Sequence, residues 1–264
     1  MGKTIGIISL KGGVGKTTIV VSLGAALSEF GIKVLLIDGN IFSPSLGLHL
    51  NIMDPEKTLH HVLNRTAHAK DAIYEYEGFH VMPASIFEKL ESSPLKLKDK
   101  IKGLKRIYDI ILIDSSPSLD VETLAVILAS DEVFVVTTPD HPTLSATMKA
   151  VKLSKQRGTP VTGIILNKVH NKNFEIPLED IEETLEVPVL AVIPYDVNVL
   201  KALSIMEPLT MHKPKSEGSE EFKKLAAAMI GQKYKQTRLG NFFRMFIPKK
   251  QEINRVIFYD RVFK

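Results

Sequence analysis

The sequence feature that most constrains the fold is a set of short, continuous apolar runs that alternate with helix-like stretches. The runs are rich in β-branched residues and end at turn residues, a pattern typical of strands that are covered on both faces of a sheet. They lie at residues 4–10, 33–38, 79–84, 108–114, 132–138, 161–167 and 187–194. Helical patterns separate them, at residues 16–29, 57–65, 95–106, 121–130, 142–156, 177–186 and 219–231. This alternation predicts an α/β fold with a doubly wound, mostly parallel sheet flanked by helices.

Composition narrows the classes of protein to which the chain can belong. The 264 residues contain no cysteine, which excludes disulfides, zinc–thiolate sites, iron–sulfur clusters and a cysteine nucleophile. No apolar run reaches the roughly 18–20 residues that a membrane span needs. The N-terminus shows no signal-peptide pattern, because residues 3–10 run directly into a glycine-rich loop. We therefore expect a cytoplasmic protein.

Residues 11–18 read KGGVGKTT and lie between the first predicted strand and the first predicted helix. Glycines let backbone N–H groups approach phosphate oxygens, a lysine neutralises the β- and γ-phosphates, and a hydroxyl group binds Mg²⁺. The helix that follows points its positive end at the same anion. We therefore predict a phosphate-binding loop in which Lys16 neutralises phosphate and Thr17 binds the metal. The nucleotide-binding residues predicted in this loop are Lys11, Gly12, Gly13, Val14, Gly15, Lys16, Thr17 and Thr18.

The front of this loop departs from the common pattern, because Leu10 stands where the first glycine is usual and Lys11 follows it. In this respect KGGVGKTT resembles the deviant phosphate loop of the MinD/ParA family of P-loop ATPases, and most closely that of MinD-like proteins. The resemblance implies a P-loop NTPase fold of the MinD/ParA type, ATP or ADP and Mg²⁺ as cofactors, and ATPase activity. It also implies an ATP-dependent homodimer in which Lys11 contacts the nucleotide of the partner subunit while Lys16 serves its own.

Two further segments resemble the switch regions of the same family. Residues 35–50 look like switch I, and residues 110–120 look like switch II with its magnesium motif. Asp114 ends an apolar strand, where a carboxylate can hold a magnesium-bound water. The resemblance places Asp38, at the end of another such strand, near the metal as well. The predicted metal site therefore consists of Thr17, Asp38 and Asp114.

The adenine side of the family's site is matched by residues 163–169 and 192–203. Asn167 ends a predicted strand, where its amide could bind the edge of the base. Pro194 and Asp196 are expected to flank the base.

Asn40 is a departure from the family pattern. MinD and ParA proteins usually carry a second aspartate in this DxD position, which helps to place the attacking water, whereas this chain reads Asp38-Gly39-Asn40. Asparagine can orient water, but it can neither accept a proton nor carry negative charge. Lys11, Lys16, Asp38 and Asn40 are thus the predicted catalytic residues, with the hypothesis that hydrolysis is slow or needs a partner to complete the site.

A basic, amphipathic tail is predicted after residue 231, so we divide the chain into an ATPase domain, 1–231, and a tail, 232–264. The tail holds nine Lys/Arg and two Asp/Glu, a net charge of +7 in a chain whose total is +4. A helical stripe of large apolar residues within it comprises Leu239, Phe242, Phe243, Phe246 and Ile247. Such a helix can lie in an anionic lipid surface, and MinD proteins carry a C-terminal membrane-targeting helix of this kind. Residues 253–263 are a candidate extension of the anchor.

These features favour a MinD-like ATPase switch, peripherally bound to the inner face of the cell membrane, that positions a cell-division or other apparatus. A regulatory or cargo protein, not identified by the sequence, is an expected partner. A ParA-like partition ATPase that binds DNA is the alternative, less favoured because the stripe is rich in phenylalanine. An ATP-gated membrane scaffold with very slow hydrolysis is a further alternative, and the apolar stripe could instead pack on the protein's own core or on a partner.

Overall fold

The computed structural model describes residues 2–234 and 250–262. The described strands are β1 (Lys3–Ile8), β2 (Val34–Gly39), β3 (Tyr74–Tyr76), β4 (Phe79–Met82), β5 (Ile110–Ser115), β6 (Glu132–Thr137), β7 (Val161–Val169) and β8 (Val189–Pro194). The described α-helices are α1 (Lys16–Glu29), α2 (Leu46–His49), α3 (Leu59–Leu63), α4 (Leu97–Ile101), α5 (Val121–Ala129), α6 (His141–Gln156), α7 (Leu178–Leu185), α8 (Val197–Ser204), α9 (Leu209–His212), α10 (Glu217–Met229) and α11 (Lys250–Val262). Short 3-10 helices cover Ala69–Ala72, Pro94–Lys96 and Lys102–Arg106.

The described strands form one eight-stranded sheet in the order β3-β4-β2-β5-β1-β6-β7-β8. Each adjacent pair is parallel except β3 and β4, which are antiparallel. The predicted doubly wound, mostly parallel sheet is therefore confirmed, and each of the apolar runs predicted as a strand belongs to it. The short β3 was not predicted, because its half-exposed sequence, YEY, contains no apolar run.

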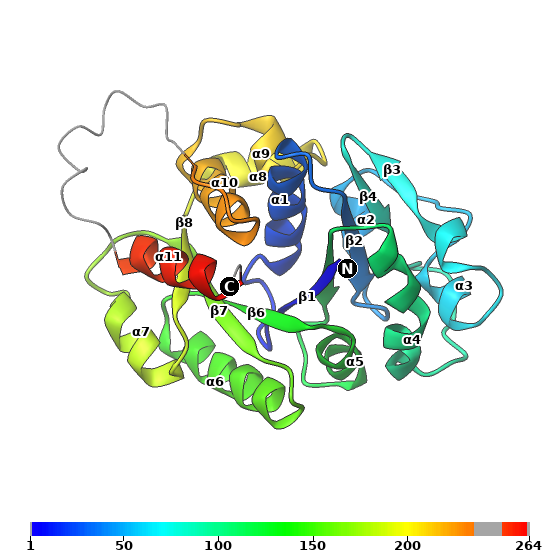
Figure 1. Ribbon diagram of the computed structural model, residues 1–264, viewed down its shortest axis with the longest axis horizontal. Coiled ribbons are helices and arrows are strands. Elements are labelled where there is room, and N and C mark those ends of the chain that lie inside the picture. The colour runs from blue at the N-terminus through cyan, green and yellow to red at the C-terminus, as the bar shows by residue number, and fades with distance from the viewer. Residues whose placement is uncertain (1, 235–249, 263–264) are drawn as a thin grey trace.

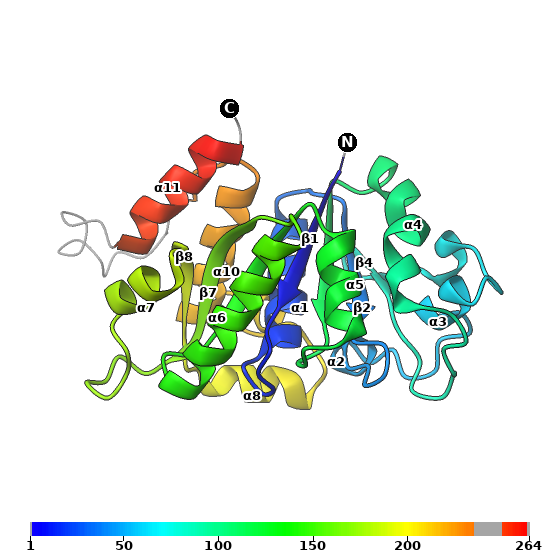
Figure 2. The same ribbon diagram turned by 90° about the horizontal axis from the view of Figure 1, so that it is seen from below.

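Helices cover both faces of the sheet. Figures 1 and 2 show α1, α9 and α10 on one face and α5, α6 and α7 on the other. Along β2, Leu36 belongs to the apolar cluster on the first side, whereas Leu35 and Ile37 belong to the cluster on the second. Because successive side chains of a strand point to opposite faces, burial on both faces explains why the runs are continuously apolar.

Helix α11 packs against β8 and α10, although the sequence places residues 250–262 in the tail. The Phe258 side chain is 4% exposed, and its ring meets that of Phe134 edge-on with 6.0 Å between centroids. Arg255 is equally buried; its Nε donates to the Leu190 carbonyl at 2.6 Å, and its guanidinium forms an ion pair with Glu221 of α10. The candidate extension of the anchor is therefore a helix with one face on the domain, and its Ile253, Val256 and Ile257 remain exposed on the other.

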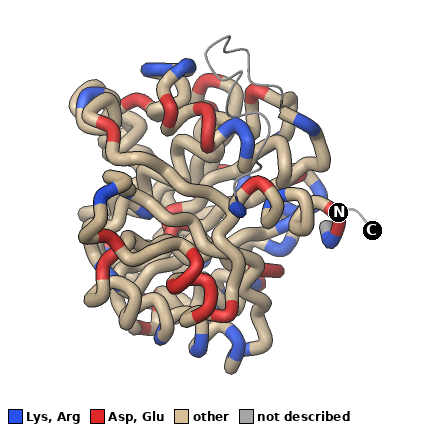
Figure 3. The backbone as a smooth tube through the Cα atoms, turned by 90° about the vertical axis from the view of Figure 1, so that its left-hand side faces the viewer, with Lys and Arg blue, Asp and Glu red and all other residues tan. Residues whose placement is uncertain are grey.

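The side of the molecule around α7 and α11 carries interspersed acidic and basic residues (Figure 3). Lys250 of α11 pairs with Glu182 of α7 at 2.8 Å, and Lys224 of α10 pairs with Glu252 at 3.2 Å. The chain leaves α10 at Tyr234, whose hydroxyl donates to Glu220 at 3.2 Å. Positions 234 and 250 are thus both held on the domain.

The predicted apolar stripe lies outside the described residues. It comprises Leu239, Phe242, Phe243, Phe246 and Ile247, all within residues 235–249. Within residues 2–234 and 250–262, every helix is too short or too polar to cross a bilayer.

Candidate functional site

The phosphate loop connects the end of β1 to the start of α1 at the carboxyl edge of the parallel strands. Gly13 and Gly15 have φ angles of +77° and +90°, in the left-handed region that favours glycine. A Cβ added to Gly15 would also lie 2.4 Å from Nδ2 of Asn167. Gly15 precedes the first residue of α1, so the loop and the positive end of the helix meet at one point. This is a geometry suited to an anion.

Lys16, Thr17 and Asp114 come together below the loop. The Lys16 side chain is only 8% exposed, and its Nζ lies 3.5 Å from Asp114 Oδ1. Thr17 Oγ1 donates to Asp114 Oδ2 at 2.5 Å and lies 3.0 Å from Ser45 Oγ. Asp114 is fully buried, and its Oδ1 accepts no hydrogen bond from any described residue. A half-buried hydroxyl beside a buried carboxylate with such an unsatisfied oxygen fits a hard cation such as Mg²⁺.

Asp38 completes this oxygen cluster from the neighbouring strand. It is paired in register with Asp114 across β2 and β5, and it is fully buried. Asp38 Oδ2 accepts from the N–H groups of Ser45 at 3.1 Å and Leu46 at 2.9 Å, and Oδ1 accepts from that of Asn40 at 3.2 Å. Burial and then the charge of Asp114 outweigh these bonds and raise the pKa of Asp38 to about 8. A bound divalent cation would favour the ionised form instead.

Asn40 lies two positions after Asp38, within residues 35–50 that resemble switch I, and is buried. Its side-chain Nδ2 donates to the Ser43 carbonyl, so the amide group closes the turn of its own loop. This bond uses one of the two N–H donors of the amide, so the second N–H and the Oδ1 atom remain to meet a water.

Lys11 occupies a different position from Lys16. It is exposed at the front of the loop, where its backbone N–H donates to Ser9 Oγ at 3.2 Å. Its amino group forms no ion pair with any residue in the described part of the chain. Burial acts to raise the pKa of nearby Asp140, but hydrogen bonds from Thr138 and Thr143 and the charge of Lys11 lower it overall. Of the two lysines of the loop, Lys16 thus faces inward and Lys11 faces solvent.

The residues predicted on the adenine side lie at the ends of β7 and β8. Asn167 Nδ2 donates to the Val14 carbonyl at 2.6 Å, so this side chain contacts the phosphate loop itself. Pro194 ends β8, opposite Val169. Asp196 caps α8 by accepting from the N–H of Asn198 at 2.8 Å. The structure therefore brings all three to the loop's edge of the sheet.

Two residues of the site were not predicted from the sequence. Lys168 Nζ donates to the Gly13 carbonyl at 2.7 Å. Glu122 of α5 is buried and accepts from the N–H of Phe42 in switch I at 2.6 Å, and burial raises its pKa. A glutamate in the first turn of a helix is ordinarily explained by the helix dipole, so nothing in the sequence distinguished Glu122. For Lys168, the available signal was its position directly after Asn167, which the sequence had already placed at the site.

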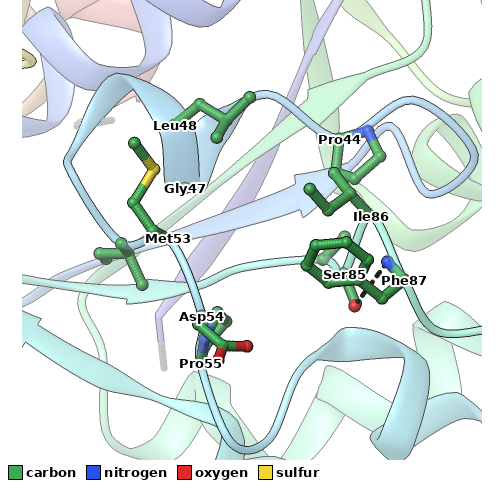
Figure 4. Close-up of a pocket in the computed structure, with 11 residues that line it drawn as sticks. Pro44, Gly47, Leu48, Met53, Asp54, Pro55, Ser85, Ile86 and Phe87 are labelled. Atoms are coloured by element: carbon green, nitrogen blue, oxygen red, sulfur yellow. Dashed lines mark hydrogen bonds between the residues drawn. The ribbon is translucent and has the colours of Figure 1, made fainter.

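A groove lies beside switch I, between the α2 region and the loop after β4 (Figure 4). Figure 4 shows Met53 on one side of it and Ile86 and Phe87 on the other. Its lining includes Pro44, Gly47, Leu48, Met53, Ile86 and Phe87. Pro44 and Gly47 flank Ser45 and Leu46, whose N–H groups donate to Asp38 Oδ2, so one wall of the groove is continuous with the nucleotide site.

Comparison with known proteins agrees with this geometry. Residues 2–156 match a family model described as an AAA domain. An uncharacterised ATP-binding protein of Methanocaldococcus jannaschii is 38% identical over 252 residues, which cover 94% of this chain and 95% of the relative. The cell division ATPase MinD of Pyrococcus furiosus superposes with a TM-score of 0.82 at 38% identity, covering 86% of this chain and 97% of that one. The septum site-determining protein MinD of Pyrococcus horikoshii, solved with Mg-ADP, gives a TM-score of 0.81 at 37% identity, covering 86% and 95%.

Proposed function

Because this chain belongs to the MinD/ParA family of P-loop ATPases, we propose that it is a MinD-like switch that hydrolyses ATP, dimerises when ATP is bound, and binds membrane reversibly. Its cofactors are ATP or ADP and Mg²⁺. Such a switch would position a cell-division apparatus or another cellular apparatus, and it would act together with a regulatory or cargo protein. The protein would be cytoplasmic and peripherally attached to the inner face of the cell membrane.

The observation that carries this proposal is the division between the two loop lysines. Lys16 is enclosed with Asp114, where it would meet the phosphates of its own nucleotide. Lys11 is exposed and forms no ion pair with a described residue, so its charge is available to a second subunit. Two opposed basic loops repel each other unless phosphate charge lies between them. Dimerisation would therefore depend on the nucleotide, with each Lys11 contacting the partner subunit's triphosphate.

The residues around Lys16 then divide the work of hydrolysis. Thr17, Asp38 and Asp114 would hold Mg²⁺, which when bound neutralises charge that develops on the phosphates. Asn40 would orient the attacking water through Oδ1 without accepting its proton. The absence of a carboxylate at position 40 supports slow turnover, with a partner protein needed for a faster rate.

Membrane binding rests on the sequence of residues 238–247 and on the place where the structure holds the flanking chain. Apolar side chains and basic neighbours suit an anionic lipid surface, and each basic residue adds about 1 kcal/mol near such a surface. One short segment of this kind binds weakly and reversibly. Two segments on one dimer gain from effective concentration, so the nucleotide would control how long the protein stays on the membrane.

The test is the oligomeric state with a non-hydrolysable ATP analogue and Mg²⁺, measured by light scattering. We expect a dimer for the wild type and a monomer for Lys11→Ala, which retains the analogue because Lys16 is intact. A wild-type protein that stays monomeric with the analogue, in solution and on vesicles, would refute the switch.

A second measurement separates membrane from DNA as the surface that is bound. Pelleting with anionic vesicles is run beside binding to double-stranded DNA, each with and without the ATP analogue. Nucleotide-dependent pelleting that is lost when Phe242, Phe243 and Phe246 are replaced by serine supports the membrane, because this change leaves α11 on the domain. Salt-sensitive, nucleotide-dependent DNA binding without pelleting favours the partition ATPase instead.

A further inference from the structure

The end of β7 departs from regular strand geometry beside the phosphate loop. Lys168 has a φ angle of +57°, in the left-handed region that a lysine rarely adopts. The register with β8 also shifts between Leu166 and Val169. In a regular strand, consecutive side chains point to opposite faces. Here the consecutive side chains of Asn167 and Lys168 both reach the same loop.

These two side chains hold two consecutive carbonyl groups. Lys168 Nζ donates to the Gly13 carbonyl at 2.7 Å, and Asn167 Nδ2 donates to the Val14 carbonyl at 2.6 Å. A trans peptide unit is planar, and its C=O and N–H point in opposite directions. Fixing the Gly13 carbonyl therefore fixes the N–H of Val14. Fixing the Val14 carbonyl fixes the N–H of Gly15 in the same way.

The N–H groups of Val14 and Gly15 are the ones that a phosphate would need. They belong to the glycine-rich turn at the start of α1, where successive backbone N–H groups form an anion-binding concavity. Neither donates a hydrogen bond to another residue in the described ranges. The orientation of these N–H groups is therefore fixed by the hydrogen bonds that Asn167 and Lys168 of β7 donate to the preceding carbonyls.

We propose that Asn167 and Lys168 are positioning residues of the phosphate loop. They hold the Gly13 and Val14 carbonyls toward β7, so that the next N–H groups face the β-phosphate before the nucleotide binds. Backbone strain at Lys168 is retained because it brings the amine to the loop, and strain of this kind concentrates at functional sites. This role concerns nucleotide binding by one subunit, so it depends on neither dimerisation nor membrane binding.

The decisive variant is Lys168→Gly, which removes the amine and also relieves the positive φ. Glycine adopts that φ freely, so we expect the thermal midpoint without nucleotide to equal or exceed that of the wild type. Affinity for Mg-ADP, measured by calorimetry on the full chain, should nevertheless fall by about fivefold, the effect of losing one hydrogen bond of typical net strength, because this bond is exposed to solvent. Lys168→Arg should recover part of that loss.

Inorganic pyrophosphate with Mg²⁺ distinguishes this role from contact with the base. If Lys168 positions the phosphate loop, competition by pyrophosphate against labelled ADP weakens in Lys168→Gly by the same factor as ADP binding. Lys172→Met removes another exposed lysine of the same region and is the matched control. Its affinity should stay within about twofold, because within the described residues the Lys172 side chain donates no hydrogen bond to the phosphate loop, whereas that of Lys168 does. Unchanged ADP affinity in Lys168→Gly, a loss that leaves pyrophosphate unaffected, or an equal loss in Lys172→Met would each overturn the proposal.

Discussion

Replacement of Phe258 by alanine should release α11 from the domain without unfolding the domain. Phe258 is 4% exposed and packs edge-on against Phe134. Truncating a buried phenylalanine to alanine costs about 3–5 kcal/mol. A 13-residue helix is only marginally stable in water, so α11 depends on its contacts with the domain and a loss of this size should open it more often. The sheet and α10 keep the rest of their core, and the global thermal midpoint should change little.

Hydrogen exchange followed by mass spectrometry measures this release directly. At about 1.4 kcal/mol for each factor of ten, a loss of about 3 kcal/mol predicts exchange in α11 that is faster by about a hundredfold. Amides of α10 should keep their wild-type rates. Ile257→Ala is the matched control, since Ile257 is the preceding residue of the same helix but is 45% exposed. Unchanged α11 exchange in Phe258→Ala, or equal acceleration in both variants, would show that Phe258 does not hold α11 on the domain.

Three more predictions concern the nucleotide site. Glu122→Ala removes the buried acceptor of the Phe42 N–H. Loss of such a bond costs about 1–3 kcal/mol, so hydrogen exchange in the loop that contains Phe42 should be faster, whereas exchange in the phosphate loop should keep its wild-type rate. Asn40→Asp should raise the steady-state ATPase rate, because a carboxylate can accept the proton of the attacking water; an unchanged rate with and without membranes would count against the assigned role. Gly15→Ala should abolish ADP binding in a fluorescence titration, since its φ is +90° and its Cβ would lie 2.4 Å from the Asn167 amide, whereas Gly103→Ala, outside the site and with no atom within 4 Å of the added carbon, should bind normally.

The sheet was predictable from the sequence because its strands are buried on both faces. Such strands read as continuous apolar runs, and burial of both faces of β2 illustrates the cause. Lys16 and Thr17 were predictable because they stand next to each other in the phosphate-loop motif, so the sequence shows them together. A parallel sheet then brings Asp114 to the same edge, because the carboxyl ends of its strands lie together.

Helix α11 was not predictable as a part of the domain. The apolar spacing of residues 253–257 reads equally well as a surface that faces lipid. The residues that decide the matter are Phe258 and Arg255, and an arginine is rarely buried unless it is paired. Its partners are Glu221 and the Leu190 carbonyl, which are 34 and 65 positions away along the chain. Tertiary contacts of that range leave no local pattern.

The attachment of the chain at both Tyr234 and Lys250 has a consequence for geometry at a bilayer. A fully extended chain spans at most about 3.3–3.6 Å per residue. Leu239 therefore stays within roughly 18 Å of Tyr234, and Ile247 within roughly 11 Å of Lys250. If the intervening residues enter lipid, the domain cannot swing away as it could on a single free arm. It would rest close to the headgroups, and its rotation about the bilayer normal would be the main freedom left.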